Sequence, residues 1–159
     1  MSYNSIQLRG DFERYEGLVA ATKTITPGML VEVSATGVAP VGSAKVVEKA
    51  FAVEDALQGK PIFSAAEAAA REASHGTKEV SGDYAAGDLI QYNIQQPGNR
   101  VYAWVVGTGT ETLAVGQLLG PSTTEGVLGK NDTAGQTIAV ITEAVDVTTT
   151  PSRVPVRII

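Results

Sequence analysis

Apolar and polar residues alternate in several short segments of the chain, which is the period of a β-strand with one buried face. In Leu89–Ile94, apolar residues hold the even positions and polar residues hold two of the odd ones. Val101–Val106 is apolar on both faces, which is typical of a strand inside a sheet. Between them, Pro97 presets φ for the first central position of a turn, and Gly98 accepts positive φ at the second. The pattern predicts an antiparallel hairpin.

One segment, Ser64 to His75, has the character of a helix instead. Ser64 and Glu67 have the spacing of a capping box, the residues between Ala65 and Ala73 are mostly helix formers, and Gly76 follows as a C′ residue. This predicts one short α-helix. Because its side chains are mostly Ala, it buries little surface, and we interpret residues 61–80 as a helical insertion on the surface.

Two parts of the chain resemble each other at an offset of 88 or 89 residues. Each part is expected to form a hairpin followed by one more strand, and the two are expected to pack around the central hairpin. Two ordinary hairpins of similar composition are the alternative. The shared anchors are a Gly that opens the unit, a Ser-x-Thr turn and a Glu after the third strand, which are Gly28, Ser34 and Glu54 in one copy and Gly116, Ser122 and Glu143 in the other.

Three turns place a Gly directly before a strand, at Gly28, Gly87 and Gly116. We expect positive φ there, because only Gly adopts it without steric cost. With abundant Val and Thr and 17 Gly in 159 residues, the fold class expected from the pattern is mainly β, in a single domain with one short helix.

Composition narrows the possible partners. The formal net charge is −5, and the 12 basic residues are mixed with 17 acidic ones, so nucleic acid is not an expected partner. Cysteine is absent, which excludes a disulfide framework and thiolate chemistry. The first residues have no signal-peptide pattern, and no apolar run approaches about 20 residues, so we expect synthesis in a cytoplasm and no membrane partner.

Candidate chemistry is sparse, and the expectation is no enzyme, no catalytic residue, no metal and no cofactor. The only histidine, His75, ends the predicted helix, where it suits the last carbonyl groups. Glu54 and Asp55 are adjacent in a predicted strand end, so their side chains point to opposite faces. The Gly-rich segment at 107–111 lacks the Gly-Lys-Ser/Thr ending of a phosphate-binding loop, and no calcium-loop pattern surrounds Asn131.

Several short motifs together resemble the capsid decoration proteins of tailed bacteriophages, also called cement or head-stabilisation proteins. The resemblance covers residues 17–60 and 84–159. It implies a compact β-barrel-like or β-tulip domain at residues 17–159 and assembly into homotrimers. The motifs are Ile25-Thr-Pro-Gly-Met-Leu-Val-Glu, Phe51-Ala-Val-Glu-Asp-Ala-Leu-Gln-Gly-Lys, Tyr84-Ala-Ala-Gly-Asp-Leu-Ile, Leu113-Ala-Val-Gly-Gln-Leu-Leu, and Glu143-Ala-Val-Asp with the ending Arg153-Val-Pro-Val-Arg-Ile-Ile.

The resemblance also implies a function, a location and a partner. The protein would be a structural part of the virion on the capsid exterior, made in the bacterial host cytoplasm. It would bind the major capsid protein and bridge capsomers, and so stabilise the expanded shell. Two alternatives remain open: a receptor- or carbohydrate-binding module of a phage head or tail fibre, which would expose clustered aromatics, and a small β-fold hydrolase, which would need a convergent polar pocket.

The first sixteen residues are predicted to form an N-terminal arm that holds the capsid. Ile6 and Leu8 alternate with polar neighbours, as in a strand that adds to the edge of another sheet. A frayed terminus or a strand of the domain's own sheet are the alternatives. The candidate capsid-binding residues are Tyr3, Ile6, Leu8, Arg9 and Phe12.

Overall fold

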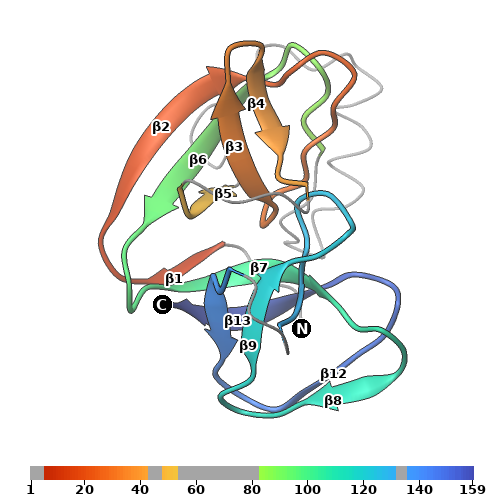
Figure 1. The fold of residues 1–159 in the computed structure, drawn as a ribbon. Helices are drawn as coiled ribbons and strands as arrows, with labels where there is room; N and C mark the ends of the chain where they lie inside the picture. The colour runs from red at the N-terminus through yellow and green to blue at the C-terminus, as the bar shows by residue number, and fades with distance from the viewer. Residues whose placement is uncertain (1–5, 43–47, 54–82, 132–135) are drawn as a thin grey trace, which may run out of the picture.

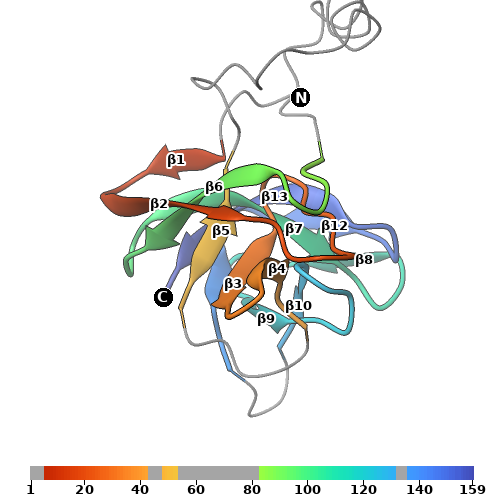
Figure 2. The same ribbon diagram turned by 90° about the horizontal axis from the view of Figure 1, so that it is seen from above.

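The computed structural model describes residues 6–42, 48–53, 83–131 and 136–159. Within these ranges the chain forms thirteen β-strands and no helix, so the mainly β prediction is confirmed. The predicted helix at 64–75, the insertion at 61–80 and the Glu54–Asp55 pair lie outside the described residues. Figure 1 shows most of the strands in two groups, one above the other, and Figure 2 shows the same groups from above.

The upper group in Figure 1 is a five-stranded antiparallel sheet that we call the first half. The strand order is β2-β6-β5-β3-β4. The outer strands of this order approach each other through a parallel bridge between Val19 and Val38, and the Ala20 N–H donates to the Val38 carbonyl at 2.8 Å. The strands are β2 (Phe12–Leu18), β3 (Leu30–Ser34), β4 (Gly37–Pro40), β5 (Ala50–Ala52) and β6 (Leu89–Gln95).

The lower group, which we call the second half, contains a closed five-stranded barrel of order β7-β10-β9-β11-β13, in which β13 pairs back onto β7. Of these pairings, β10–β7 alone is parallel. The barrel-like prediction is therefore confirmed. The barrel strands are β7 (Arg100–Val106), β9 (Leu118–Pro121), β10 (Leu128–Lys130), β11 (Ala139–Ile141) and β13 (Ser152–Ile158), with β8 (Glu111–Leu113) and β12 (Val145–Val147) as a separate ribbon and β1 (Gln7–Arg9) paired to β7.

The Pro97-Gly98 turn has the predicted geometry but not the predicted role. Gly98 has φ +94°, and the Asn99 N–H donates to the Gln96 carbonyl at 3.1 Å. However, β6 pairs with β2 and β5, whereas β7 pairs with β1, β10 and β13, so the predicted hairpin is wrong. The turn residues bond to β13 instead, since the Gly98 N–H donates to the Ile158 carbonyl at 2.8 Å. The turn is the junction between the two halves.

The predicted repeat is present in the strand pairing, and it is larger than expected. Strands β2, β3, β4, β5 and β6 of the first half correspond in order and direction to β7, β9, β10, β11 and β13 of the second. The two units do not pack around a common hairpin, because each half has its own fourth and fifth strands. Equivalent cross-strand pairs are Val31–Pro40 and Leu119–Lys130, Leu30–Phe51 and Leu118–Val140, Leu18–Leu89 and Trp104–Arg153, and Val19–Val38 and Val105–Leu128.

Matching hydrogen bonds anchor the repeat. Gly28 and Gly116 have φ +96° and +88°, as predicted, and each donates its N–H to the third strand of its unit, to Ala52 at 2.8 Å and Ile141 at 2.9 Å. Gly87, with φ +84° as predicted, donates its N–H to the Val19 carbonyl at 2.9 Å. The Ser-x-Thr anchors also match, because each Thr N–H donates to the Ser hydroxyl two residues earlier. Glu54 is outside the described residues, so its match with Glu143 stays a prediction.

The two halves share a buried core. One cluster of buried side chains lies inside the first half, and a larger one fills the second half. The larger cluster also includes Leu30, Val41 and Phe51 of the first half. Burying side chains of this size contributes roughly 1.5–3 kcal/mol each, so the contact between the halves is a substantial part of the stability.

Candidate interaction surfaces

The residues predicted to hold the capsid lie in three different environments. Ile6 is buried in the larger core cluster, whereas Leu8 and Arg9 are exposed on β1. Phe12 is half-buried at the start of β2, with the guanidinium of Arg14 5.4 Å from its ring centroid. Tyr3 is outside the described residues. Among the described members of this set, Leu8 and Arg9 are the exposed ones.

Residues 7–9 and 12–18 take the alternative left open by the sequence, a strand of the protein's own sheet, and their part in holding the capsid stays a prediction. Gln7 pairs with Val101 on β7, and the Tyr102 N–H donates to the Ile6 carbonyl at 2.9 Å. Seven residues of β2 pair with β6, and this strand runs across the boundary expected at residue 17. The alternation in the sequence identified a strand correctly. Its partner is the protein's own β7, which the pattern of one strand cannot specify.

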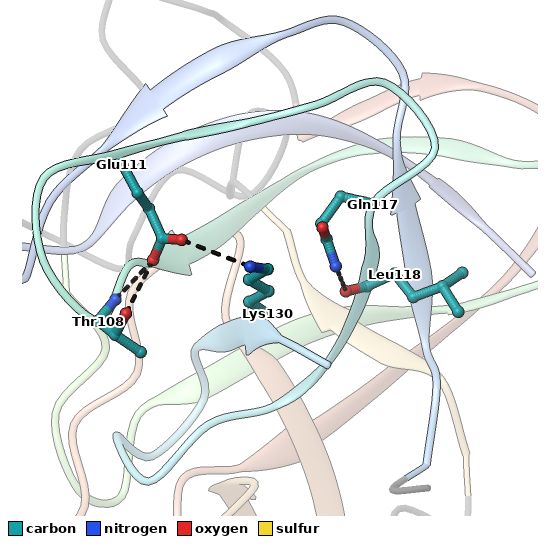
Figure 3. A network of polar contacts seen from close by, with 5 residues as sticks. All are labelled: Thr108, Glu111, Gln117, Leu118 and Lys130. Carbon is teal, nitrogen blue, oxygen red and sulfur yellow. Dashed lines mark hydrogen bonds and ion pairs between the residues drawn. The ribbon is translucent and has the colours of Figure 1, made fainter. Parts of the chain in front are cut away.

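A pocket of about 550 Å³ opens beside β10, and a small polar network lies next to it. Figure 3 shows the Glu111 carboxylate accepting the N–H and hydroxyl of Thr108 at 2.8 and 3.1 Å, with the Lys130 ammonium 3.9 Å away. Because the Thr108 N–H already donates to this carboxylate, it is not available to a phosphate bound in the Gly-rich segment at 107–111. In the described ranges, no group of His, Asp and Glu side chains is placed to hold a metal ion.

The first half contacts the second half through the turn at Thr26–Met29. The Trp104 indole Nε1 and the Arg153 Nε both donate to the Pro27 carbonyl, at 2.9 and 3.1 Å. The Arg153 guanidinium also lies 4.8 Å from the centroid of the Trp104 ring, and the Trp104 N–H donates to the Gly28 carbonyl at 3.2 Å. Pro27 and Gly28 are buried in this contact, which joins the halves by packing and by hydrogen bonds.

Two apolar groups are exposed in the part of the chain that the structure describes. Leu18 and Leu89 face each other across β2 and β6 and are 57% and 48% exposed. Val115 and Leu118 flank the turn at Gly116 and are 66% and 42% exposed. Sequence reasoning missed both groups, because alternation assigns apolar strand residues to the core. The repeat gives no signal of this exposure, because it makes Val115 and Leu118 equivalent to the buried Pro27 and Leu30.

One aromatic pair marks the surface of the first half. Tyr15 and Tyr92 are directly opposite on β2 and β6, with ring centroids 5.9 Å apart. The Tyr15 hydroxyl donates to the Glu13 carboxylate at 2.6 Å, and this bond raises the pKa of Tyr15. Burial raises the pKa of Tyr92.

Comparison with known proteins adds no assignment. No known family model and no curated protein matches the chain. The described residues include no helix of the length and apolarity needed to cross a bilayer. The function is therefore inferred from the motifs and from the surfaces above.

Proposed function

We propose that this protein is a structural component of a phage virion, which binds the outer surface of the capsid and stabilises the expanded shell by bridging capsomers. Its partners are the major capsid protein and further copies of itself in a homotrimer. The finer fold assignment, a β-tulip of the decoration-protein type, belongs to the same proposal.

The observation that carries the proposal is the position of the motifs resembling decoration proteins. The segments that begin at Ile25, Tyr84 and Leu113 contain the three Gly turns, and the ending that begins at Arg153 forms most of β13. They belong to the strands and turns that form the two halves rather than to scattered surface residues. The resemblance is therefore to the way the chain folds.

The surfaces suit binding rather than chemistry. Closely packed apolar side chains fill the second-half barrel, and a close-packed interior has low compressibility, so this half is expected to be rigid. Leu8 and Arg9 are exposed on β1, whose described partner is β7, and they present one apolar and one cationic side chain. In a trimer, three such strands act together, so weak individual contacts gain by effective concentration.

The test is co-sedimentation of the purified protein with empty capsids of the encoding phage, in the expanded and unexpanded forms. We expect binding to the expanded form and little to the unexpanded form. A Leu8→Glu, Arg9→Glu variant should bind at least about tenfold more weakly. This change in affinity corresponds to a loss of about 1.4 kcal/mol of binding free energy. Val33→Glu is the matched control, since Val33 is exposed on β3, in the other half from β1 and its partner β7.

Point variants are used rather than a deletion of the N-terminal residues, because a deletion would also remove Ile6 from the core. Equal binding to both capsid forms, or none, would contradict the proposal. The alternative, a receptor- or carbohydrate-binding module, requires clustered exposed aromatics. Among the described residues, Tyr15 is the one aromatic side chain with large exposure. Glycan binding that depends on Tyr15, without capsid binding, would favour that alternative.

A further inference from the structure

We infer that copies of the chain assemble head to tail, with the second-half turn at Ala114–Gln117 of one copy docked on the Leu18–Leu89 surface of the next. The contact would repeat between chains the one that joins the two halves within a chain. This deepens the proposed function, because it names the surfaces through which the copies meet, and it rests on that function only for the presence of several copies.

The donor side follows from the equivalence of the two turns. Gly28 and Gly116 have the same sign of φ and make the same hydrogen bond to the third strand of their units. Pro27 and Gly28 are nevertheless buried, whereas Val115 and Gly116 are exposed. The residue two positions after each glycine repeats the difference, because Leu30 is 1% exposed and its equivalent Leu118 is 42% exposed. The second half thus carries an unused copy of the surface that the first half buries.

The acceptor side follows from the strand registers. Trp104 lies opposite Arg153 across β7 and β13, and Leu18 lies opposite Leu89 across β2 and β6. The two pairs are equivalent, because the residue after Trp104 and the residue after Leu18 each form the parallel contact that closes their half. In the second half, Trp104 and Arg153 both donate hydrogen bonds to the Pro27 carbonyl of the turn. In the first half, the equivalent pair Leu18–Leu89 is apolar and exposed.

The two unused surfaces match in chemistry. The turn Ala114-Val-Gly-Gln carries no charged side chain, and it would meet two leucines in place of Trp104 and Arg153. A contact between different patches on successive copies is heterologous, and it closes into a ring when the rotation between the copies allows it. Three copies would then place six similar halves around one axis, which agrees with the proposed homotrimer. The occupant of the Leu18–Leu89 surface is therefore a second copy of this chain.

The first experiment uses the absence of cysteine from the chain. Leu18→Cys protein is mixed with Val115→Cys protein, oxidised, and run on a non-reducing gel. We expect a disulfide-linked pair containing one chain of each kind. Val33→Cys replaces Leu18→Cys in the control, because Val33 is similarly exposed on β3, and its yield should be at least fivefold lower. Links that form only between identical variants would overturn the head-to-tail arrangement in favour of a two-fold dimer.

The second experiment measures mass in solution by sedimentation velocity, without capsids. The wild type should form one discrete oligomer, and Val115→Glu, Leu118→Glu should be monomeric with an unchanged circular dichroism spectrum. Val33→Glu should keep the wild-type mass. Mixing Val115→Glu with Leu18→Lys should restore pairing between unlike chains, which neither variant forms alone and which an unfolded variant could not form. A monomeric wild type at all concentrations, or an oligomer insensitive to these substitutions, would overturn the inference.

The outcomes also separate this inference from the proposed function. A monomeric protein that binds expanded capsids would overturn the assembly and leave the proposed function standing. An oligomer with the expected cross-link that ignores capsids would overturn the proposed function and leave the assembly standing.

Discussion

The two halves of the molecule have the same strand order and the same turn geometry, yet they treat equivalent surfaces in opposite ways. The first half buries its Pro27-Gly28 turn and Leu30 against the second half, and the second half exposes the equivalent Val115-Gly116 turn and Leu118. This difference shows that the repeat determines the strand order and the turn geometry of each half. The role of each surface depends on what lies next to it in the assembled molecule.

The two halves also differ in how they close. The second half closes through the parallel pairing of β10 with β7, at Leu128–Val105 and Gly129–Val106, whereas the first half closes through the single bridge from Val19 to Val38. Two glycines permit that approach. A Cβ at Gly17 would lie 2.6 Å from the Val38 side chain, and a Cβ at Gly37 would lie 2.5 Å from the Leu18 carbonyl oxygen. Backbone contact replaces side-chain packing at this seam.

The sharpest test of the comparison is truncation of the equivalent leucines. Leu30→Ala should reduce the free energy of unfolding by about 2–5 kcal/mol, because it leaves a cavity between the halves. Leu118→Ala should change it by less than about 0.5 kcal/mol in dilute, monomeric protein, since the side chain is exposed. Chemical denaturation followed by circular dichroism measures both. Equal costs would show that the two positions are not distinguished as the structure indicates.

The two turn glycines give a second matched pair. Gly116→Ala should cost about 1–2 kcal/mol, because a non-Gly residue is strained at positive φ. Gly28→Ala should cost roughly 1–3 kcal/mol more, because a Cβ there would lie 2.9 Å from the Tyr102 carbonyl oxygen and crowd a packed contact. A Cβ at Gly116 meets nothing within 4 Å. Thermal or denaturant midpoints that fall equally for both would argue against the tight contact between the halves.

The Trp104 hydrogen bond has a smaller effect. Trp104→Phe removes the donor to the Pro27 carbonyl, which keeps its bond from Arg153, so we expect a loss of about 0.5–1.5 kcal/mol. Because Trp104 is the only tryptophan, its fluorescence in the wild type reports the contact directly. We expect fluorescence and circular dichroism to change at the same denaturant concentration. Separate transitions would mean that the halves unfold independently.

The smallest effect concerns the Tyr15–Tyr92 pair, which is equivalent to the buried pair Val101–Val156 in the second half. The hydrogen bond to Glu13 raises the pKa of Tyr15 above its usual value of 10.0. Any stability from it is present below that value and is lost as the pH rises through the pKa of the folded state. An absorbance titration of Glu13→Gln should show the pKa of Tyr15 lowered and that of Tyr92 nearly unchanged.

The N-terminal residues illustrate how much of the site the sequence could predict. The alternation around Ile6 and Leu8 correctly indicated a strand, since period-2 patterning is a local property. The pattern does not contain the identity of the partner strand, so it left open whether this strand joins the protein's own sheet or the sheet of a partner. Burial of Ile6 and exposure of Leu8 follow from the docking of β1 on β7.

The sequence by itself determined the local features of this protein: the strand character of its segments, the turns at Gly28, Gly98 and Gly116, and the repeat. Each depends on the conformational range of one residue or on spacing along the chain. Only the tertiary structure decided that β6 and β7 belong to different halves and that Leu18 is exposed where Trp104 is covered. Those outcomes depend on packing between distant segments, which no local pattern encodes.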